Sequence, residues 1–309
     1  MSAESEIVNI AICTCSRELL LAKCLDSLNA VVVPAGITVR VSVIDNAADE
    51  SARAVVDAYR CTGKFSADYV VEPRRGIPCA RNRALDHAQR MEAAYLAFID
   101  DDEWVTPEWL SELLNCSRQM GTDSVISGAV KSVVPDGVSQ HISYFFTREK
   151  GGRTGDRLEA CATNNVLIPM AVVVRYGLRF DESNPLAGGT DTIFFVNAVR
   201  HGVAIYKCKK ALVYEHVPLS RANLRWLAKR KYRAGITDAW RKIQKGRKPI
   251  AIFFSATVSI VLQSLLCLTG LALLQRRLAN RAWLKVSKSA GTIMGLLGRE
   301  VESYREIDR

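Results

Sequence analysis

The first 120 residues of the chain alternate four times between a short apolar run and a segment with apolar residues at helical spacing. Short apolar runs are typical of buried strands, and apolar residues three or four positions apart are typical of amphipathic helices. Strands are expected at residues 7–14, 39–44, 69–71 and 95–99, and helices at 18–30, 51–59, 76–94 and 108–120. The alternation therefore predicts an α/β fold, in which a mostly parallel sheet carries helices on both faces.

Residues 124–213 continue this body less regularly. Strands are expected at residues 124–134, 165–168 and 204–213, and a helix at 190–201. Residues 135–159 hold four glycines among charged residues, which is a composition typical of loops. A long mobile loop is therefore expected between the first two of these strands.

Charge is divided unevenly along the chain. Residues 1–215 hold 23 Lys and Arg against 27 Asp and Glu, whereas residues 216–309 hold 19 against 5. A hydrophobic fraction of 49% excludes a disordered chain, and nine cysteines without a CxxC pair argue against a disulfide framework and a cysteine zinc site. The first residues do not resemble a signal peptide, because no basic region precedes the first apolar run. We expect a body in the reducing cytoplasm and a strongly basic tail.

Acidic side chains stand where two of the expected strands end. Asp45 ends the second strand, and Asp100, Asp101 and Asp102 end the fourth. Ligands of open α/β sheets bind beyond the carboxyl ends of the strands. Three adjacent carboxylates repel one another unless a cation neutralises them, and hard divalent cations prefer such oxygen ligands. The triplet therefore indicates a metal site, with a solvated acidic turn as the alternative.

No glycine-rich phosphate loop accompanies these acids. The first strand is not followed by G-x-G-x-x-G, and Gly63 and Lys64 lack the preceding glycine of a Walker motif. A phosphate-bearing ligand is therefore expected to bind through a metal and through cationic side chains. Arg81, near the start of the helix expected at 76–94, is a candidate, and a surface arginine is the alternative.

Seven motifs follow one another along the body of the chain. They read VNIAICTCSR, VSVIDNAADE, RRGIPCARNRAL, YLAFIDDDEWVTPEWL, NNVLIP, LAGGTDTIFF and ALVYEHVP. In this order they resemble the motifs of family 2 glycosyltransferases, and most of all those of bacterial exopolysaccharide glycosyltransferases of the succinoglycan type. The resemblance covers about residues 7–220. It implies a Rossmann-like domain of the GT-A fold at residues 1–220, followed by a basic helical region at 221–309.

The resemblance also implies roles for individual residues. Positions that bind the nucleotide-sugar donor are matched by Thr14, Asp45, Arg81, Asp100 and Asp101. Asp102 matches the ligand of a divalent metal, Mg²⁺ or Mn²⁺, and His216 matches a late histidine that joins the metal or the diphosphate. Asp191 matches the catalytic acid, although Thr190 stands where many members carry Glu.

The implied reaction is an inverting, metal-dependent transfer of a hexose, with Asp191 as the general base. Glucose from UDP-glucose is the expected donor, and a polyprenyl-diphosphate-linked glycan of exopolysaccharide or other surface-glycan biosynthesis is the expected acceptor. A catalytically inactive nucleotide-binding membrane scaffold is one alternative, and the presence of Asp191 argues against it. A nucleic-acid-binding protein would explain the basic tail but neither the acid triplet nor the uncharged stretch described next, so no nucleic-acid partner is expected.

The tail combines an uncharged stretch with basic flanks. Residues 250–274 are 25 consecutive uncharged, mostly apolar residues, enough to cross a hydrocarbon core of about 30 Å as a helix. Basic residues stand on both sides, so the charge bias chooses no orientation and favours a helix that lies in the membrane plane. A helix buried in a larger core is the alternative. We expect a peripheral or monotopic protein at the cytoplasmic face of the inner membrane.

Residues 221–248 hold eleven Lys and Arg and a single acid, Asp238. Two functions are open for this stretch. It can dock on anionic lipid headgroups, which we favour, or Arg225, Trp226 and Arg230 can face the active site and hold a lipid-linked diphosphate.

Overall fold

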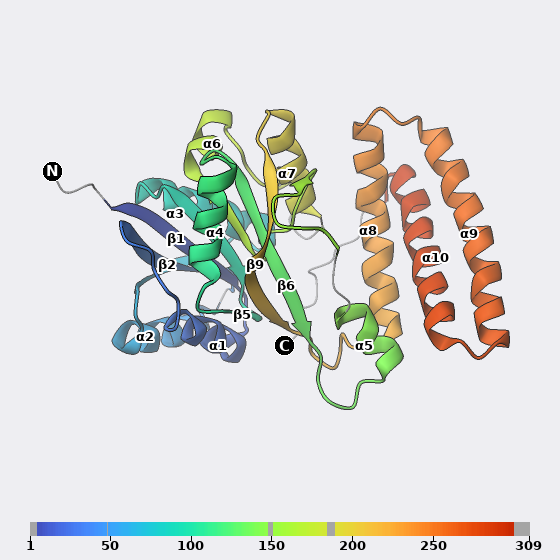
Figure 1. The fold of residues 1–309 in the computed structure, drawn as a ribbon, viewed down its shortest axis with the longest axis horizontal. Coiled ribbons are helices and arrows are strands. Elements are labelled where there is room, and N and C mark those ends of the chain that lie inside the picture. Colours follow the sequence, from blue (N-terminus) through green and yellow to red (C-terminus); the bar gives the residue numbers. More distant parts are fainter. Residues whose placement is uncertain (1–4, 48, 148–150, 184–188, 300–309) are drawn as a thin grey trace.

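The computed structural model describes residues 5–47, 49–147, 151–183 and 189–299. In this part of the chain a nine-stranded sheet is followed by three long helices (Figure 1). Residues 148–150 of the expected loop and residues 186–188 of the LAGGTDTIFF motif lie outside the described residues.

The first half of the sheet is parallel. Strand β1 (Glu6–Thr14) lies between β2 (Ile37–Asp45) and β4 (Tyr95–Asp100), and β3 (Ser66–Val71) pairs with the outer side of β2. In this register Thr14 pairs with Asp45, and Cys13 pairs with Asp100. The polar residues that end three strands therefore meet at one edge of the sheet, as the sequence predicts.

The second half of the sheet is mixed. Strand β8 (Val166–Pro169) runs antiparallel to β4, and β6 (Val125–Val133) pairs antiparallel with β8 and parallel with β9 (Ile205–His216). Strand β5 (Glu103–Val105) pairs with the end of β9, which places Glu103 opposite Glu215. This pairing brings the end of β9 next to the acid triplet that follows β4.

Helices cover both faces of the sheet, so the α/β fold class is confirmed. Helices α1 (Glu18–Leu28), α2 (Arg53–Thr62) and α4 (Trp109–Met120) pack on one apolar core. Helices α3 (Ile77–Arg90), α6 (Met170–Tyr176) and α7 (Thr190–Arg200) pack on the other. Each core takes alternate side chains of the strands, because successive residues of a strand point to opposite faces. Ile10 and Ile12 lie in the first core, and Ala11 lies in the second.

The prediction of a long loop at residues 135–159 is partly wrong. It contains helix α5 (Gln140–Thr147) and strand β7 (Arg157–Leu158), which pairs with β9. Helix α5 depends on contacts with the tail: the ring of Phe146 stacks on Trp226 at 6.1 Å between centroids, and the guanidinium of Arg277 lies 5.7 Å from the centroid of Tyr144. Local composition does not reveal such partners.

The tail forms three helices in a row. Helix α8 (Leu224–Gln244) lies beside the sheet domain, α9 (Pro249–Ala272) lies at the far edge, and α10 (Arg276–Leu296) packs between them (Figure 1). Asn223 caps α8, because its side-chain oxygen accepts a hydrogen bond of 2.9 Å from the backbone N–H of Trp226. The uncharged stretch thus forms the helix that lies farthest from the sheet.

Glycines allow α8 and α10 to touch backbone to backbone. A Cβ atom at Gly291 would lie 1.9 Å from the carbonyl oxygen of Tyr232, and one at Gly235 would lie 2.0 Å from the carbonyl oxygen of Lys288. Neither carbonyl can move without breaking its helix. The distance between the two helices therefore requires glycine at both positions.

Replacing Gly291 with valine is expected to separate α10 from α8. The new side chain collides with a backbone carbonyl, so the free energy of unfolding of the tail should fall by about 3 kcal/mol or more, the upper end for overpacked sites. Thermal unfolding of the purified protein in detergent measures the change. Lys285→Val introduces the same β-branched residue at an exposed position of α10 and serves as the control. Equal melting temperatures of the two variants would contradict the prediction.

Candidate active site

A cavity of about 680 Å³ opens beyond the carboxyl ends of β1 and β4. The ends of these strands form its floor, α3 and the start of α7 contribute side chains to its sides, and α8 closes it from the tail. The predicted site residues on its wall are Thr14, Arg81, Asp100, Asp101, Asp102 and Asp191. The fold therefore brings together six residues that are up to 177 positions apart in the sequence.

Asp45 lies outside the lining of this cavity. It is fully buried, and its carboxylate accepts hydrogen bonds from the backbone N–H groups of Ala47 and Ala52 at 2.9 and 3.1 Å and from the hydroxyl of Tyr69 at 2.7 Å. The neighbouring Asn46 lines the cavity instead. Through these hydrogen bonds Asp45 fixes the backbone that follows β2. Its contact with a nucleotide-sugar donor stays a prediction.

His216 also lies outside the lining. Its backbone N–H donates a hydrogen bond of 2.9 Å to the carbonyl oxygen of Asp102, which fixes the end of β9 against the acid triplet. Glu215, the residue before it, reaches the cavity wall. A role of the His216 imidazole in holding a metal therefore stays a prediction.

Two arginines that the sequence analysis did not assign border the acid triplet. Arg17 donates to Asp101 at 3.0 Å and reaches Asp102 at 3.4 Å, and Arg221 reaches the same oxygen of Asp102 at 3.5 Å. Asp101 also accepts a hydrogen bond of 2.7 Å from Thr14. Arg17 stands three positions after the polar end of β1, which is a signal for a ligand contact. Arg221 had no signal beyond its place in the basic stretch.

Burial and mutual repulsion raise the pKa values of the triplet. Burial, followed by the charges of Asp100 and Asp101, raises the pKa of Asp102 to about 7. Burial raises the pKa of Asp100 to about 6, against the opposing effect of Arg81, and burial also raises the pKa of Asp101. Desolvation disfavours the ionised form of a carboxyl group, so this wall carries more negative charge than its surroundings stabilise. A bound cation would remove this penalty.

The donor set of the triplet fits a divalent metal that shares its coordination with a substrate. Asp100 and Asp102 lie on the cavity wall, whereas both carboxylate oxygens of Asp101 already accept hydrogen bonds. The described residues contain no cluster of three or more acids, cysteines or histidines arranged around one point. Mg²⁺ in nucleotide sites commonly uses one or two carboxylates and completes its shell with phosphate oxygens and water. Asp102 with such ligands meets this requirement.

Arg81 offers a positive charge on the wall beside the triplet. The residue is 8% exposed, and its guanidinium lies 5.6 Å from the ring centroid of Phe180. Among the residues that the structure describes, no carboxylate lies within ion-pair distance of this guanidinium. A buried cation without an anionic partner is costly. Arg81 is therefore suited to bind the phosphates of a ligand.

Asp191 lies in the first turn of α7, is half-buried and lines the cavity. Gly189, which precedes this turn, has a φ of 91°, and a Cβ atom there would lie 2.5 Å from the hydroxyl of Thr237 in α8. Glycine is thus required by the backbone conformation and by the close approach of α8. The backbone at the start of α7 therefore lies directly against the side chain of Thr237 in α8.

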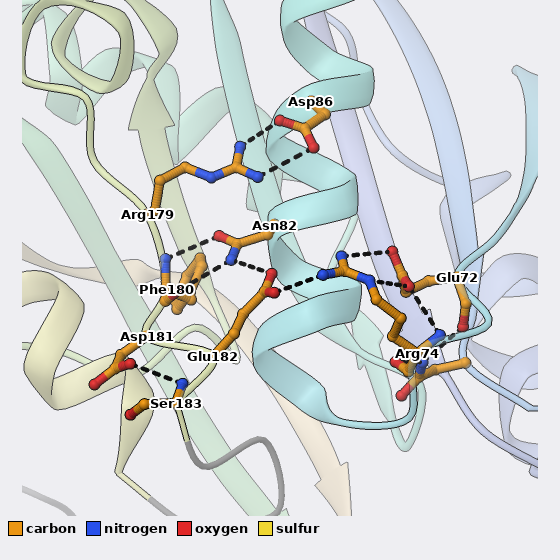
Figure 2. Close-up of polar contacts among 10 residues, drawn as sticks. Glu72, Arg74, Asn82, Asp86, Arg179, Phe180, Asp181, Glu182 and Ser183 are labelled. Carbon is orange, nitrogen blue, oxygen red and sulfur yellow. Dashed lines mark hydrogen bonds and ion pairs between the residues drawn. The ribbon is translucent and has the colours of Figure 1, made fainter.

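A polar network ties the segment before α7 to α3 (Figure 2). The buried Asn82 donates to the carbonyl oxygen of Phe180 at 2.9 Å and to Glu182 at 2.7 Å, and it accepts from the N–H of Phe180 at 2.8 Å. Arg74 binds the other oxygen of Glu182 at 2.7 Å, and Arg179 pairs with Asp86. Because Arg81 precedes Asn82 in the same helix, this network fixes residues 179–182 relative to Arg81.

Helix α8 gives the cavity a basic wall. Side chains of the tail on this wall include Trp226, Arg230, Arg233, Thr237, Asp238 and Arg241, with Lys288 from α10. Asp238 is held by Arg241 at 2.7 Å, Lys242 at 2.9 Å and Lys288 at 3.5 Å. Trp226 and Arg230 thus face the cavity, whereas Arg225 is not among its lining residues. This placement agrees with the second of the two hypotheses for residues 221–248 in the position of Trp226 and Arg230 but not of Arg225. Binding of a diphosphate there, and docking of the stretch on lipid headgroups, stay predictions.

Comparison with known proteins gives a family match for the first part of the chain and a relative that covers nearly all of it. The sequence pattern described as "Glycosyl transferase family 2" matches residues 9–176. The chain is 35% identical to the succinoglycan biosynthesis protein ExoM of Rhizobium meliloti (strain 1021), over 98% of this chain and 97% of that protein.

Solved structures share the fold. The chain is similar to residues 1–349 of S. aureus TarS, with a TM-score of 0.55 and 17% identity over 93% of this chain and 89% of that one. It spans 39% of the longer TarS chain. Structures of TarS 1–349 in complex with UDP and with UDP-GlcNAc match with TM-scores of 0.54 and 0.53. The likeness confirms the GT-A architecture expected from the motifs.

Proposed function

Because the chain belongs to glycosyl transferase family 2, we propose that it transfers a hexose from a nucleotide sugar to a lipid-linked glycan at a membrane. The observation that carries the proposal is a single cavity in which the acid triplet and Arg81 face Asp191 and a basic wall from α8. One side of such a cavity suits a nucleoside diphosphate, and the other suits an anionic acceptor. The relative ExoM is named for succinoglycan biosynthesis, so an exopolysaccharide or another surface glycan is the proposed product.

The donor is proposed to lie over the ends of β1 and β4. TarS 1–349, which shares the fold, has been solved with UDP and with UDP-GlcNAc. Thr14, Asp100 and Asp101 line the ends of β1 and β4 in this chain, and Arg81 lines the same cavity. UDP-glucose is the donor we propose.

Transfer requires a base on one side of the sugar and charge stabilisation on the other. Asp191 is proposed to take the proton from the acceptor hydroxyl as that oxygen attacks the anomeric carbon. The bond from the anomeric carbon to the diphosphate breaks, and its electron pair leaves with the nucleoside diphosphate. Displacement from the opposite face inverts the anomeric centre. Arg81, Arg17 and Arg221 supply positive charge for the leaving diphosphate.

Asp102 is the residue proposed to hold Mg²⁺ or Mn²⁺. A divalent cation bound there supplies Lewis-acid stabilisation of the departing diphosphate. Arg17 and Arg221, which reach the same carboxylate oxygen, offset part of its charge in the absence of donor.

The proposed function is tested by incubating the purified full-length protein with a panel of nucleotide sugars. Slow, metal-dependent release of the nucleoside diphosphate from one of them is expected, because water replaces the missing acceptor. Membrane extract from the native cell should then accelerate release and take up the sugar. A protein that binds nucleotide sugars but releases no diphosphate under either condition would instead be an inactive scaffold.

Helix α9 is proposed to lie in the cytoplasmic face of the membrane. Among the described residues it is the helix long and apolar enough to cross a bilayer, with a mean hydropathy of 2.1. Most of its large apolar side chains point outward. Its packed side holds Ile252, Ala256 and Gly270 together with polar groups: Ser259 bonds Ser289 of α10 at 2.9 Å, and Gln263 has a buried oxygen. The exposed apolar residues include Ile250, Phe253, Phe254, Val258, Val261, Leu262, Leu265, Leu266, Leu268 and Leu271. An exposed apolar face of this size is typical of a surface that contacts a membrane or another protein.

The neighbouring helix argues against a complete span. Helix α10 packs along α9 from the contact of Gly270 with Ala279 to the hydrogen bond between Ser259 and Ser289. Over the same length it carries three cations, Arg281, Lys285 and Lys288. A spanning α9 would take these charges into the hydrocarbon, which is costly. An in-plane α9 leaves them at the level of the anionic headgroups.

Placing two charges on the outer face of α9 is expected to release the protein from membranes. In Leu262→Asp with Leu265→Asp, two exposed leucines lose their burial in lipid, about 1.5–3 kcal/mol each. The partition coefficient on anionic vesicles should fall at least about tenfold in a flotation assay. Leu219→Asp with Ile243→Asp makes the same change at exposed positions outside α9 and is the control.

The in-plane orientation is tested separately in sealed inverted vesicles. Cysteines placed at Arg247 and Arg276, each in a Cys61→Ser background, should both react with an impermeant maleimide from the cytoplasmic side. Reaction at only one of them would indicate a span.

A further inference from the structure

A second cavity, a groove of about 460 Å³, lies between α8 and α10. Its walls are mostly apolar and include Ala228, Tyr232, Trp283, Val286 and Ala290. Trp283 is 46% exposed, although tryptophan is a residue that folding normally covers. The groove therefore presents apolar surface that the described residues leave uncovered.

Arg233 joins this groove to the active-site cavity. It lines both, so its side chain stands where the apolar walls meet the basic wall of α8. Among the described residues no carboxylate pairs with Arg233. The nearby acid of α8, Asp238, is already held by Arg241, Lys242 and Lys288. Arg233 is therefore a cation suited to an anionic ligand at the junction of a polar and an apolar compartment.

The groove also lies in the direction of the membrane. Helix α8 lies beside the sheet domain, α10 packs behind it with Lys288 reaching the active-site cavity, and α9 packs on the far side of α10 (Figure 1). Because Arg233 lines both cavities, a ligand that leaves the membrane beside α9 has a route to the active-site cavity along the α8–α10 groove. Such a ligand must carry three parts in a fixed order: an apolar chain for the groove, an anionic group for Arg233, and a polar group that enters the active-site cavity.

We propose that the α8–α10 groove binds the isoprenoid chain of a polyprenyl-diphosphate acceptor and that Arg233 binds its diphosphate. The proposal rests on the acceptor class proposed above and adds the site that recognises it. A polyprenyl-diphosphate glycan has the required order of parts. An anionic phospholipid shares the chain and the charge but has no glycan to place near Asp191.

Two variants test the site through acceptor kinetics. Ala290→Phe fills the groove, and Arg233→Ala removes the charge at its end. Either should raise KM for a polyprenyl-diphosphate glycan by roughly tenfold to a hundredfold. Ala290→Phe, at a residue outside the active-site cavity, should leave UDP binding and slow donor hydrolysis unchanged. Arg247→Ala removes an exposed cation of the same tail outside both cavities and should leave KM unchanged. If both site variants keep KM within about threefold of the parent, the groove is not the acceptor site.

Photo-crosslinking of the parent protein gives a readout that does not depend on how the variants fold. A benzophenone analogue of geranylgeranyl diphosphate should label peptides of α8 and α10 around Tyr232 and Trp283, and unlabelled geranylgeranyl diphosphate should compete. Labelling confined to α9, or competed equally by phosphatidylglycerol vesicles, would overturn the proposal in favour of general lipid contact. A parent that binds no UDP and transfers no sugar would instead refute the proposed function itself, so the two failures are distinguishable.

Discussion

Replacing Asp191 with asparagine is expected to lower kcat for transfer by roughly 10²–10⁴, the effect typical of removing a general base. In the parent chain the Asp191 carboxylate accepts a hydrogen bond of 3.0 Å from the backbone N–H of Thr192. Asparagine keeps the size of the side chain and can accept this hydrogen bond, but it cannot take a proton. Binding of UDP and of the metal should stay near the parent values, because Asp191 stands on the acceptor side of the cavity. Titration calorimetry and steady-state kinetics on the same preparations separate the two effects.

The matched control for this variant is Asp136→Asn, which removes an exposed carboxylate remote from the cavity lining. Its kcat should equal that of the parent. The product of the parent should carry the inverted anomeric configuration by NMR. A retained configuration, or an Asp191→Asn rate within a few-fold of the parent, would remove Asp191 from the role of base and leave the fold and family unchanged.

Replacing Asp102 with asparagine is expected to abolish most of the metal dependence of donor binding. The parent should also show a characteristic pH dependence, because a metal can bind only after the Asp102 proton has left. With a pKa of about 7 in the absence of metal, the affinity for Mg²⁺ should fall about tenfold for each pH unit below 7. Calorimetry of Mg²⁺ and UDP binding between pH 5.5 and 8 measures this slope. Equal UDP affinity with and without metal in the parent would contradict the metal role.

The same substitution is expected to stabilise the metal-free fold. The folded pKa of Asp102 lies above its unfolded value of 3.8, so its contribution is most favourable below that value and is lost as the pH rises toward 7. At pH 8 Asp102→Asn should therefore raise the free energy of unfolding by on the order of 2 kcal/mol, and at pH 4 the gain should disappear. Asp123→Asn, which removes an exposed partner of Arg175, should show no such gain.

The parallel half of the sheet could be predicted from sequence because its information is local. The strands β1, β2 and β4 are continuous apolar runs that end in polar residues, and their helices repeat apolar residues at a constant spacing. The three residues of β5 and the two of β7 have no such signal, because they are strands only through pairing with β9, roughly fifty to a hundred positions later. Helix α5 was missed for the same reason, since its rings pack on Trp226 and Arg277.

The residues of the candidate site also divide into those with a local sequence signal and those placed by long-range packing. Strand ends identified the acid triplet, because parallel strands bring their carboxyl ends together, whereas Thr14 was identified by the resemblance to family 2 glycosyltransferases. Asp45 also ends a strand, but its carboxylate turns inward to the backbone of residues 47 and 52, a choice that depends on the loop after β2. The arginines of α8 could be counted in the sequence. Which of them face the cavity is decided by the packing of α8 on the sheet domain.

A protein shortened to residues 1–220 would keep every strand of the sheet and lose one wall of the cavity. Such a form is attractive for soluble expression and crystallisation, because it lacks α9. Screening nucleotide sugars with it would nevertheless register hydrolysis and overlook transfer, since water has free entry where α8 stands in the full chain. Acceptors are therefore best sought with the intact protein. Changes confined to α8 offer a way to re-engineer acceptor preference while the donor pocket stays untouched.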